Sequence, residues 1–221
     1  MTELYTIDTA VNSKEIGSVY PQAGLTLNYN KHANDSIRNL KSFELPKFEP
    51  NFHFFQLDNE ALPTDLLSAS MMQYGLMTSI KLKSFLHKFE IQESRFFDAP
   101  VHTSIEKLEY SWLHFGQTEI LSYINFSKSK FWIYEFGSRK SVVSIDSYEH
   151  YKNIKSTISN MSNIKAESLV LNTPFMKDLF VIPYIDGQSY ISKKMKLAIE
   201  KSKFTGIEIK PAKHIQILNE F

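Results

Sequence analysis

The sequence contains no cysteine among its 221 residues. Disulfide frameworks, thiolate zinc sites, iron–sulfur clusters and cysteine nucleophiles are therefore excluded. The first residues, MTELYTIDTAVNSKE, lack a basic start followed by a long apolar stretch, and apolar runs elsewhere are short. We therefore expect neither a signal peptide nor a membrane span, and we expect a cytoplasmic protein.

Glycine is also scarce, with seven residues, and the nearest two are Gly17 and Gly24. Loops that bind phosphate need several glycines close together, and no G-x-G-x-x-G, Walker or G-x-S-x-G pattern is present. The seven histidines include no pair at i, i+2 or i, i+4 spacing, and H-E-x-x-H is absent. We therefore expect no catalytic constellation, no metal site and no cofactor.

The charges nearly cancel, with 25 Lys+Arg against 24 Asp+Glu, but they are unevenly distributed along the chain. Residues 1–126 carry 15 acids and 10 bases, whereas residues 127–221 carry 9 acids and 15 bases. If the halves fold as separate lobes, the basic half would attract an acidic partner at low ionic strength. The plainer interpretation is that these lysines face solvent and contact no partner.

Short segments rich in aromatic and β-branched residues, bounded by Gly, Asn, Ser or Asp, predict most of the secondary structure as strands. Asp186-Gly187 predicts a hairpin. The order of elements favours an α+β fold with largely antiparallel sheets flanked by a few helices. The predicted strands are 4–7, 25–29, 108–115, 130–136, 141–145, 168–172, 178–185 and 206–211.

Four helices are predicted from caps and apolar periodicity, and no internal repeat is visible. The first would begin at Thr64–Asp65 and end before Gly75, and the second would begin at Thr78. The third follows a capping box at Asp146–Glu149, and the last begins at Ser192 and ends near Gly206. The inward stripes are Leu82, Phe85, Leu86 and Phe89; Tyr151, Ile154, Ile158 and Met161; and Met195, Ala198 and Ile199.

Two arrangements of domains fit these predictions. The chain divides into an acidic half, 1–125, and a basic α+β half, 126–221, or it forms one continuous domain. The acidic half would hold β pieces, a connector near 30–50 that contains Pro46 and Pro50, and two helices near 64–89.

The aromatic strands and the last helix supply the candidate binding residues. Alternate residues of a strand share a face, so both aromatic strands have bulky side chains on each face. These aromatics either pack under helices or present a surface to a partner. The lysines of the last helix either contact a partner or form its solvated face. The candidate partner-binding residues are Tyr110, Trp112, His114, Trp132, Tyr134, Lys193, Lys194 and Lys196.

Three segments are similar to known sequences: ALPTDLLSASM at 61–71, YSWLHFGQTEILSYINFSKSKFWI at 110–133, and residues 179–211. In the last, a serine is followed by a helix and then by Thr-Gly-hydrophobic-x-hydrophobic-x-Pro. Together they resemble a family of bacterial immunity proteins from polymorphic-toxin systems. Where that family tends to have an aspartate in a Y-I-D-W-x-K-S stretch, this chain has Asn125. The matching residues of the last unit are Ser192, Thr205, Gly206, Ile207, Ile209 and Pro211.

The resemblance implies a non-enzymatic protein that neutralises a cognate toxin domain, encoded nearby, by direct binding. It supplies no catalytic residue. The residues themselves leave a second function open, a nucleic-acid or nucleotide-binding module that uses the basic aromatic C-terminal half, although the low net charge and three arginines disfavour nucleic acid. A third is an enzyme centred on Asp98, His102 or His114. A homodimer is compatible with all of these.

Overall fold

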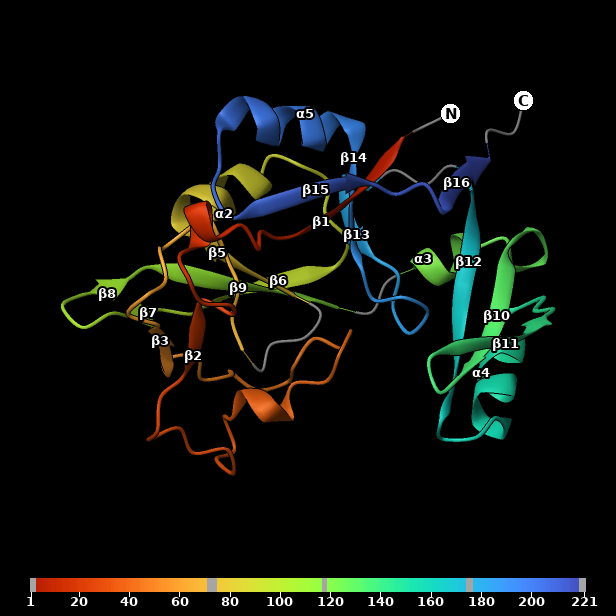
Figure 1. The fold of residues 1–221 in the computed structure, drawn as a ribbon, viewed down its shortest axis with the longest axis horizontal. Coiled ribbons are helices and arrows are strands. Elements are labelled where there is room, and N and C mark those ends of the chain that lie inside the picture. Colours follow the sequence, from red (N-terminus) through yellow and green to blue (C-terminus); the bar gives the residue numbers. More distant parts are fainter. Residues whose placement is uncertain (1–2, 71–74, 117–118, 174–176, 219–221) are drawn as a thin grey trace.

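The computed structural model describes residues 3–70, 75–116, 119–173 and 177–218. Within these ranges the strands form four sheets of four strands each, and helices pack against them (Figure 1). Most strand pairs are antiparallel; among the described pairs of named strands, β3–β7 and β12–β16 are parallel. The predicted α+β fold with largely antiparallel sheets is confirmed.

Two antiparallel sheets, each containing one strand inserted from elsewhere in the chain, form the centre of the molecule. In the first sheet β1 lies between β14 and β15, and in the second β9 lies between β5 and β6. The first sheet consists, in spatial order, of β13 (Leu179–Val181), β14 (Ser189–Ser192), β1 (Leu4–Thr9) and β15 (Ile207–Pro211). The second consists of β4 (Leu66–Leu67), β5 (Gly75–Ser79), β9 (Tyr110–Phe115) and β6 (Ser94–Asp98).

The other two sheets lie on opposite sides of this centre in Figure 1. One consists of β2 (Ala23–Leu25), β3 (Phe55–Leu57), β7 (Val101–His102) and β8 (Lys107–Leu108). The other, which we call the outer sheet, consists of β11 (Ser138–Val143), β10 (Lys130–Glu135), β12 (Ser162–Asn172) and β16 (Ile215–Leu218). The remaining elements are α1 (Ser13–Ile16), η1 (Ile37–Asn39), α3 (Ile120–Tyr123), η2 (Phe126–Lys128) and α4 (Tyr148–Thr157).

The two central sheets repeat one arrangement. In each, a short strand pairs with a second strand, and a helix follows the second strand. A third strand then returns to the same sheet, and a strand from elsewhere in the chain lies between the second and the third. The first unit is β4, β5, α2 (Ile80–Leu86) and β6 around β9, and the second is β13, β14, α5 (Lys193–Ser202) and β15 around β1. This structural repeat was not predicted from the sequence. Aligned without a gap, the two units share a sparse set of identities that stands out only once the common fold is known: Asp65/Asp178, Leu66/Leu179, Ser79/Ser192, Lys81/Lys194, Lys83/Lys196 and Lys88/Lys201.

A serine caps the helix of each unit and also binds an aspartate of the same unit. Ser79 Oγ accepts a hydrogen bond from Leu82 N (3.1 Å) and donates one to Asp65 Oδ1 (2.8 Å). In the second unit, Ser192 Oγ accepts from the N–H at the corresponding helix position (3.1 Å) and donates to Asp178 Oδ1 (2.6 Å). In both units, therefore, a hydrogen bond between the serine and the aspartate links the helix cap to the start of the first strand, and the two residues are equally far apart in the sequence.

Each aspartate also accepts a hydrogen bond from a backbone N–H of the other unit. Thr205 N donates to Asp65 Oδ2 (3.0 Å), and Glu90 N donates to Asp178 Oδ2 (3.2 Å). Each is approached by a lysine from its own helix, at 3.9 Å for Lys81 and 2.9 Å for Lys194. The contacts are reciprocal, as at a two-fold interface in which each partner uses the same patch.

Apolar residues of the two helices meet in one shared core between the units. Leu82, Leu86, Met195 and Ile199 are buried in the same cluster, and burial of each such side chain contributes about 1.5–3 kcal/mol. The second unit takes β1 from the acidic half of the sequence. A boundary at residue 125 therefore does not separate two lobes, because the halves 1–125 and 126–221 share this sheet.

The predicted helices are corrected in four places. The segment after Thr64 is strand β4 because it pairs with β5, while Asp65 is held by the helix cap of its own unit and by Thr205; residues 71–72 lie outside the described residues. The second helix is capped by Ser79 and not by Thr78. The third helix is capped by Ser147, whose Oγ accepts from His150 N (3.1 Å), and not by Asp146. The last helix ends at Lys203, with φ 52°, before Gly206.

All the predicted strands except 25–29 are confirmed in place, although some bounds differ. Residues 26–29 do not continue β2, and β13 stops at Val181, after which a turn leads to Gly187 with φ 69°. Between residues 26 and 54 the structure has η1 as its one regular element, as expected for the proline-containing connector. None of the helices among the described residues is long and apolar enough to cross a membrane.

Candidate protein-contact surface on the β10–β11 hairpin

Three of the eight candidate binding residues are buried in strand β9. Tyr110, Trp112 and His114 are each at most 6% exposed, because β9 is a central strand with an apolar cluster on either face. The Tyr110 hydroxyl donates to the carbonyl of Thr64 (2.7 Å), and His114 Nε2 lies 2.9 Å from the carbonyl oxygen of Glu44. Burial raises the pKa of Tyr110 and lowers that of His114. We remove these three residues from the candidate surface.

The three candidate lysines of α5 each form an ion pair with a carboxylate of the protein itself. Lys193 pairs with Glu3 (2.9 Å) and Lys196 with Glu200 (2.9 Å), while Lys194 is the lysine that binds the aspartate of the second unit. Pairing with Glu3 raises the pKa of Lys193. These lysines stabilise charges of the protein itself, so a partner would have to compete with those carboxylates.

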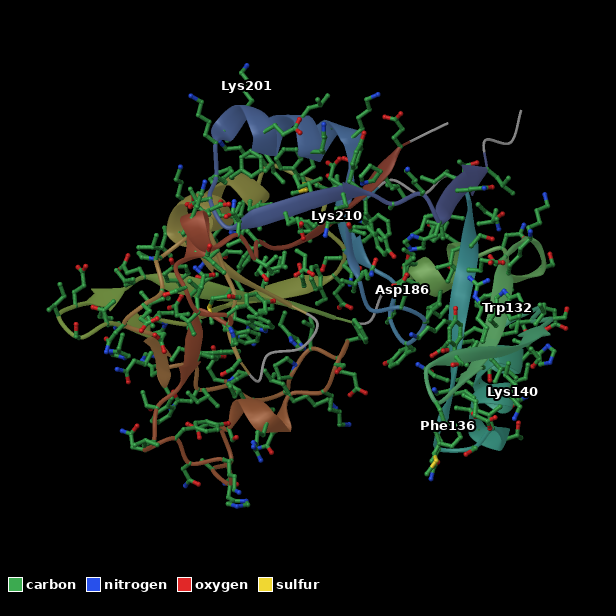
Figure 2. All side chains as sticks on the ribbon, viewed as in Figure 1. Trp132, Phe136, Lys140, Asp186, Lys201 and Lys210 are labelled. Atoms are coloured by element: carbon green, nitrogen blue, oxygen red, sulfur yellow. The ribbon has the colours of Figure 1, made fainter. Side chains whose placement is uncertain are left out.

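The other two candidates, Trp132 and Tyr134, lie on the outward face of the outer sheet. Helix α4 and Phe131 pack in the apolar cluster on the inward face of this sheet, which leaves the side chains of alternate residues on the opposite face. Both side chains are half-buried. The label of Trp132 in Figure 2 marks the position of this face, which lies well apart from helix α5.

Arg139 joins these two aromatic side chains. Its guanidinium lies 5.0 Å from the ring centre of Trp132, and its Nε donates to the Tyr134 hydroxyl (3.0 Å). It also pairs with Glu167 (3.0 Å), which accepts from Trp132 Nε1 (3.2 Å). Lys165 lies 4.9 Å from the ring centre of Tyr134. We call Trp132, Tyr134, Arg139, Lys165 and Glu167 the aromatic–arginine cluster.

The electrostatics of the cluster favour its charged forms. The hydrogen bond with Tyr134, followed by the pairing with Glu167, raises the pKa of Arg139. The hydrogen bond from Trp132, together with Arg139, lowers the pKa of Glu167. Because several contacts hold the arginine, its planar side chain keeps one orientation on an open face of the sheet.

The hairpin ends in an exposed phenylalanine. Phe136 is 77% exposed and has φ 49°, and Gly137 follows with φ 79°. Positive φ at both central residues makes a type I′ turn, which fits the twist of a hairpin but favours Asn or Gly at the first position. A bulky residue in the left-handed region costs about 1 kcal/mol or more. The protein therefore keeps an aromatic side chain at the tip in spite of backbone strain.

Two more exposed apolar residues extend this surface. Met161 and Val142 are each 65% exposed. Met161 lies beside the tip, since its carbonyl oxygen accepts a hydrogen bond from Phe136 N (3.4 Å), and Val142 pairs with Trp132 across the sheet. Met161 was predicted to be part of the buried stripe of the third helix; that is wrong, because α4 ends at Thr157.

The edge of the hairpin is less suited to binding than its face. The register between β10 and β11 shifts so that Lys140 has no partner opposite, which makes it a bulge residue beside Arg139. A bulge and adjacent cations on an edge strand disfavour pairing with another strand. The candidate surface is therefore the outward face and the tip: the aromatic–arginine cluster, Phe136, Val142 and Met161.

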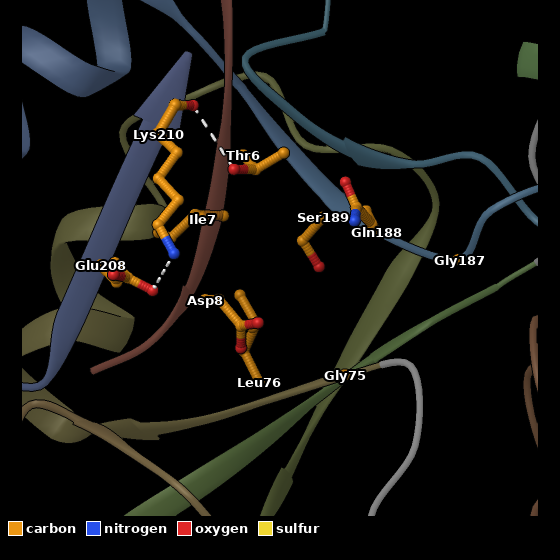
Figure 3. Close-up of a pocket in the computed structure, with 10 residues that line it drawn as sticks. All are labelled: Thr6, Ile7, Asp8, Gly75, Leu76, Gly187, Gln188, Ser189, Glu208 and Lys210. Carbon is orange, nitrogen blue, oxygen red and sulfur yellow. Dashed lines mark hydrogen bonds and ion pairs between the residues drawn. The ribbon is translucent and has the colours of Figure 1, made fainter. Parts of the chain in front are cut away.

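A cavity of about 310 Å³ lies elsewhere, between β1, β15, β5 and the loop before β14 (Figure 3). Asp8 and Glu208 are opposite each other on neighbouring strands, and Lys210 pairs with Glu208 (2.7 Å). No group of metal-ligating side chains occurs among the described residues. None of the described contacts connects Asp98, His102 and His114, and Asp98 pairs instead with Lys83 (3.8 Å).

No family model matches this sequence, and no curated protein is significantly similar to it. The resemblance to immunity proteins therefore depends on the three segments quoted above. In the segment 192–211, Ser192 caps α5, Gly206 has φ 75°, and Ile207 and Ile209 lie in β15. Those residues build the second repeat unit, and the candidate surface lies outside it.

Proposed function

We propose that this protein is an immunity protein that binds a toxin domain encoded near its own gene and neutralises it by direct contact. It acts in the cytoplasm and performs no catalysis. The observation that carries this proposal is the aromatic–arginine cluster, displayed on an open sheet face beside the exposed Phe136. The resemblance of three segments to immunity proteins supports the same function.

The residue types of the cluster are those that dominate protein interfaces. Trp, Tyr and Arg are enriched among residues whose truncation costs a complex 2 kcal/mol or more. Arg139 is already held by Trp132, Tyr134 and Glu167, so little side-chain entropy remains to be lost on binding. Stacking on the tryptophan also leaves part of the guanidinium free to meet a carboxylate of the partner.

Growth rescue tests this function. The toxin domain encoded next to the gene is expressed in bacteria together with the wild-type protein, with Trp132→Ala or with Lys201→Glu. Lys201 lies on α5, far from the hairpin in Figure 2, and serves as the control. We expect the wild type and the control to restore growth and Trp132→Ala to restore it poorly. If the wild type rescues growth from no neighbouring toxin domain, the protein is not an immunity protein.

A second function uses the same surface. Exposed aromatic side chains next to cations also bind single-stranded nucleic acid, by stacking with bases and by contacts with phosphates. Trp132 and Tyr134 with Lys165 make such an arrangement, although Arg139 covers one ring. Binding to an oligonucleotide should then be detectable at about 50 mM salt and weaken steeply at higher salt. Absence of binding at the lower salt concentration would eliminate this alternative.

A further inference from the structure

The tip of the β10–β11 hairpin is a convex point of the surface. Space around Gly137 is open, since a Cβ atom built there would meet no atom within 4 Å. The aromatic ring of Phe136 is mostly in solvent, and Figure 2 shows the residue at the lower end of the outer sheet. A projecting aromatic ring fits a concave partner. Enzymes present such concave sites at their substrate clefts.

The charges around this tip indicate an acidic partner. Four cations and two carboxylates lie on β10, β11 and the facing part of β12. Lys140 pairs with Glu135 (2.7 Å) and Arg139 pairs with Glu167 (3.0 Å), so two positive charges remain without a carboxylate partner in this set. A second copy of this chain would bring the same cations opposite one another, and like charges across an interface are unfavourable. The cations are Lys130, Arg139, Lys140 and Lys165, and the carboxylates are Glu135 and Glu167.

We infer that Phe136 is the anchor of the interface and enters an apolar pocket in the toxin domain, at a cleft rimmed by carboxylates. This inference rests on the proposed function and specifies how binding would block the toxin. The hairpin plugs the cleft, and the cationic face behind the tip meets the acidic rim. The strained φ of Phe136 is then retained because asparagine or glycine could not fill the pocket.

The substitution Phe136→Asn separates binding from folding. Asparagine is favoured at the first position of a type I′ turn, so the hairpin keeps its conformation while the aromatic ring is removed. The matched control is Ile105→Asn, because Ile105 is 89% exposed in the loop between β7 and β8, far from the hairpin in Figure 1. Ile105→Asn should melt near the wild-type temperature, and Phe136→Asn should melt at that temperature or slightly above it.

Calorimetry with the purified, catalytically inactivated toxin domain encoded next to the gene supplies the test. Removal of a hot-spot anchor should weaken binding by about 30-fold or more, whereas Ile105→Asn should bind within about 2-fold of wild type. Binding by Phe136→Asn within about 3-fold of wild type would overturn the anchor while leaving the proposed function intact. If the wild type itself does not bind, the proposed function fails as well. Raising the salt concentration should weaken wild-type binding if the rim is acidic.

Discussion

The repeat units and the β10–β11 hairpin carry similar charged and aromatic residues, but these side chains are placed in different surroundings. In the repeat units the charged side chains are paired within the chain, as with Asp178, which binds a helix cap, a lysine and a backbone N–H. On the hairpin, Arg139 is also paired, yet the aromatic surface around it remains open and Phe136 is strained. Lysine and aromatic content alone do not distinguish a structural site from a contact surface. The exposure of the surface around those side chains does.

The largest effect on stability is expected in the second repeat unit. Asp178 is 7% exposed, and Asp178→Ala leaves the backbone N–H of Glu90 and the Ser192 hydroxyl without this acceptor. We expect a loss of about 3 kcal/mol of unfolding free energy, measured in urea. Asp8→Ala, at an exposed carboxylate, should change it by less than about 0.5 kcal/mol. Equal losses for both variants would contradict the structural role of Asp178.

Trp132→Ala tests whether the hairpin face contributes to binding more than to stability. Because Trp132 is half-buried on an open face, we expect a stability loss of only about 1 kcal/mol, while binding to the toxin domain falls by about 30-fold. Isothermal calorimetry and urea unfolding measure the two effects. A variant that loses stability but binds normally would place the contact surface elsewhere.

The first repeat unit should be less sensitive than the second. Asp65 binds Ser79 and Thr205 as Asp178 binds its partners, but its lysine is 3.9 Å away and the side chain is more exposed. We expect Asp65→Ala to cost about 1–2 kcal/mol in urea unfolding. If Asp65→Ala is more destabilising than Asp178→Ala, the two repeat units do not differ in the way that their contacts indicate.

A smaller effect should appear at acid pH. Burial raises the pKa of Asp178, but hydrogen bonds from Ser192, Lys194 and Glu90 N outweigh it and hold the pKa below its usual range. A carboxyl group with a lowered folded-state pKa stabilises the fold above its unfolded pKa of about 3.9, and this contribution is lost as the pH falls through the folded value. The stability difference between wild type and Asp178→Asn should therefore be constant from about pH 5 to 7 and shrink below about pH 4. A difference that grows on acidification would contradict this assignment.

The smallest effect is a gain. Phe136→Asn places the preferred residue in the type I′ turn, and we expect unfolding free energy to rise by about 0.5–1 kcal/mol. Urea unfolding measures it. Destabilisation by this substitution would show that the phenylalanine ring supports the fold, and the strain would then need no explanation from binding.

The sequence predicts the second repeat unit well and the first poorly. Ser192 and the apolar positions of α5 are local signals, so they are readable without tertiary structure, although the helix ends before the predicted Gly206. By contrast, β4 was predicted as a helix because Thr64 and Asp65 look like a helix cap. Partners that hold them in place, Gln22 for Thr64 and Thr205 for Asp65, are distant in the chain, and no local pattern reveals such contacts.

The candidate surface was predicted only in part. Trp132 and Tyr134 were selected from strand alternation, but so were Tyr110 and Trp112, since alternation does not show which strand is central. Phe136 was missed as an exposed anchor because its φ depends on the turn type, and Phe-Gly is a weaker turn signal than Asn-Gly. Arg139 becomes informative only when it is seen between both aromatic rings.

Hydrogen exchange of the backbone amides, with and without the bound toxin domain, tests the contact surface most directly. We expect new protection to concentrate in residues 130–143 and 161–168, which hold the hairpin and the facing part of β12. Helix α5 and the cavity at Asp8 should exchange as in the free protein. Protection confined to α5 or to that cavity, with the hairpin unchanged, would contradict the β10–β11 surface as the site of binding.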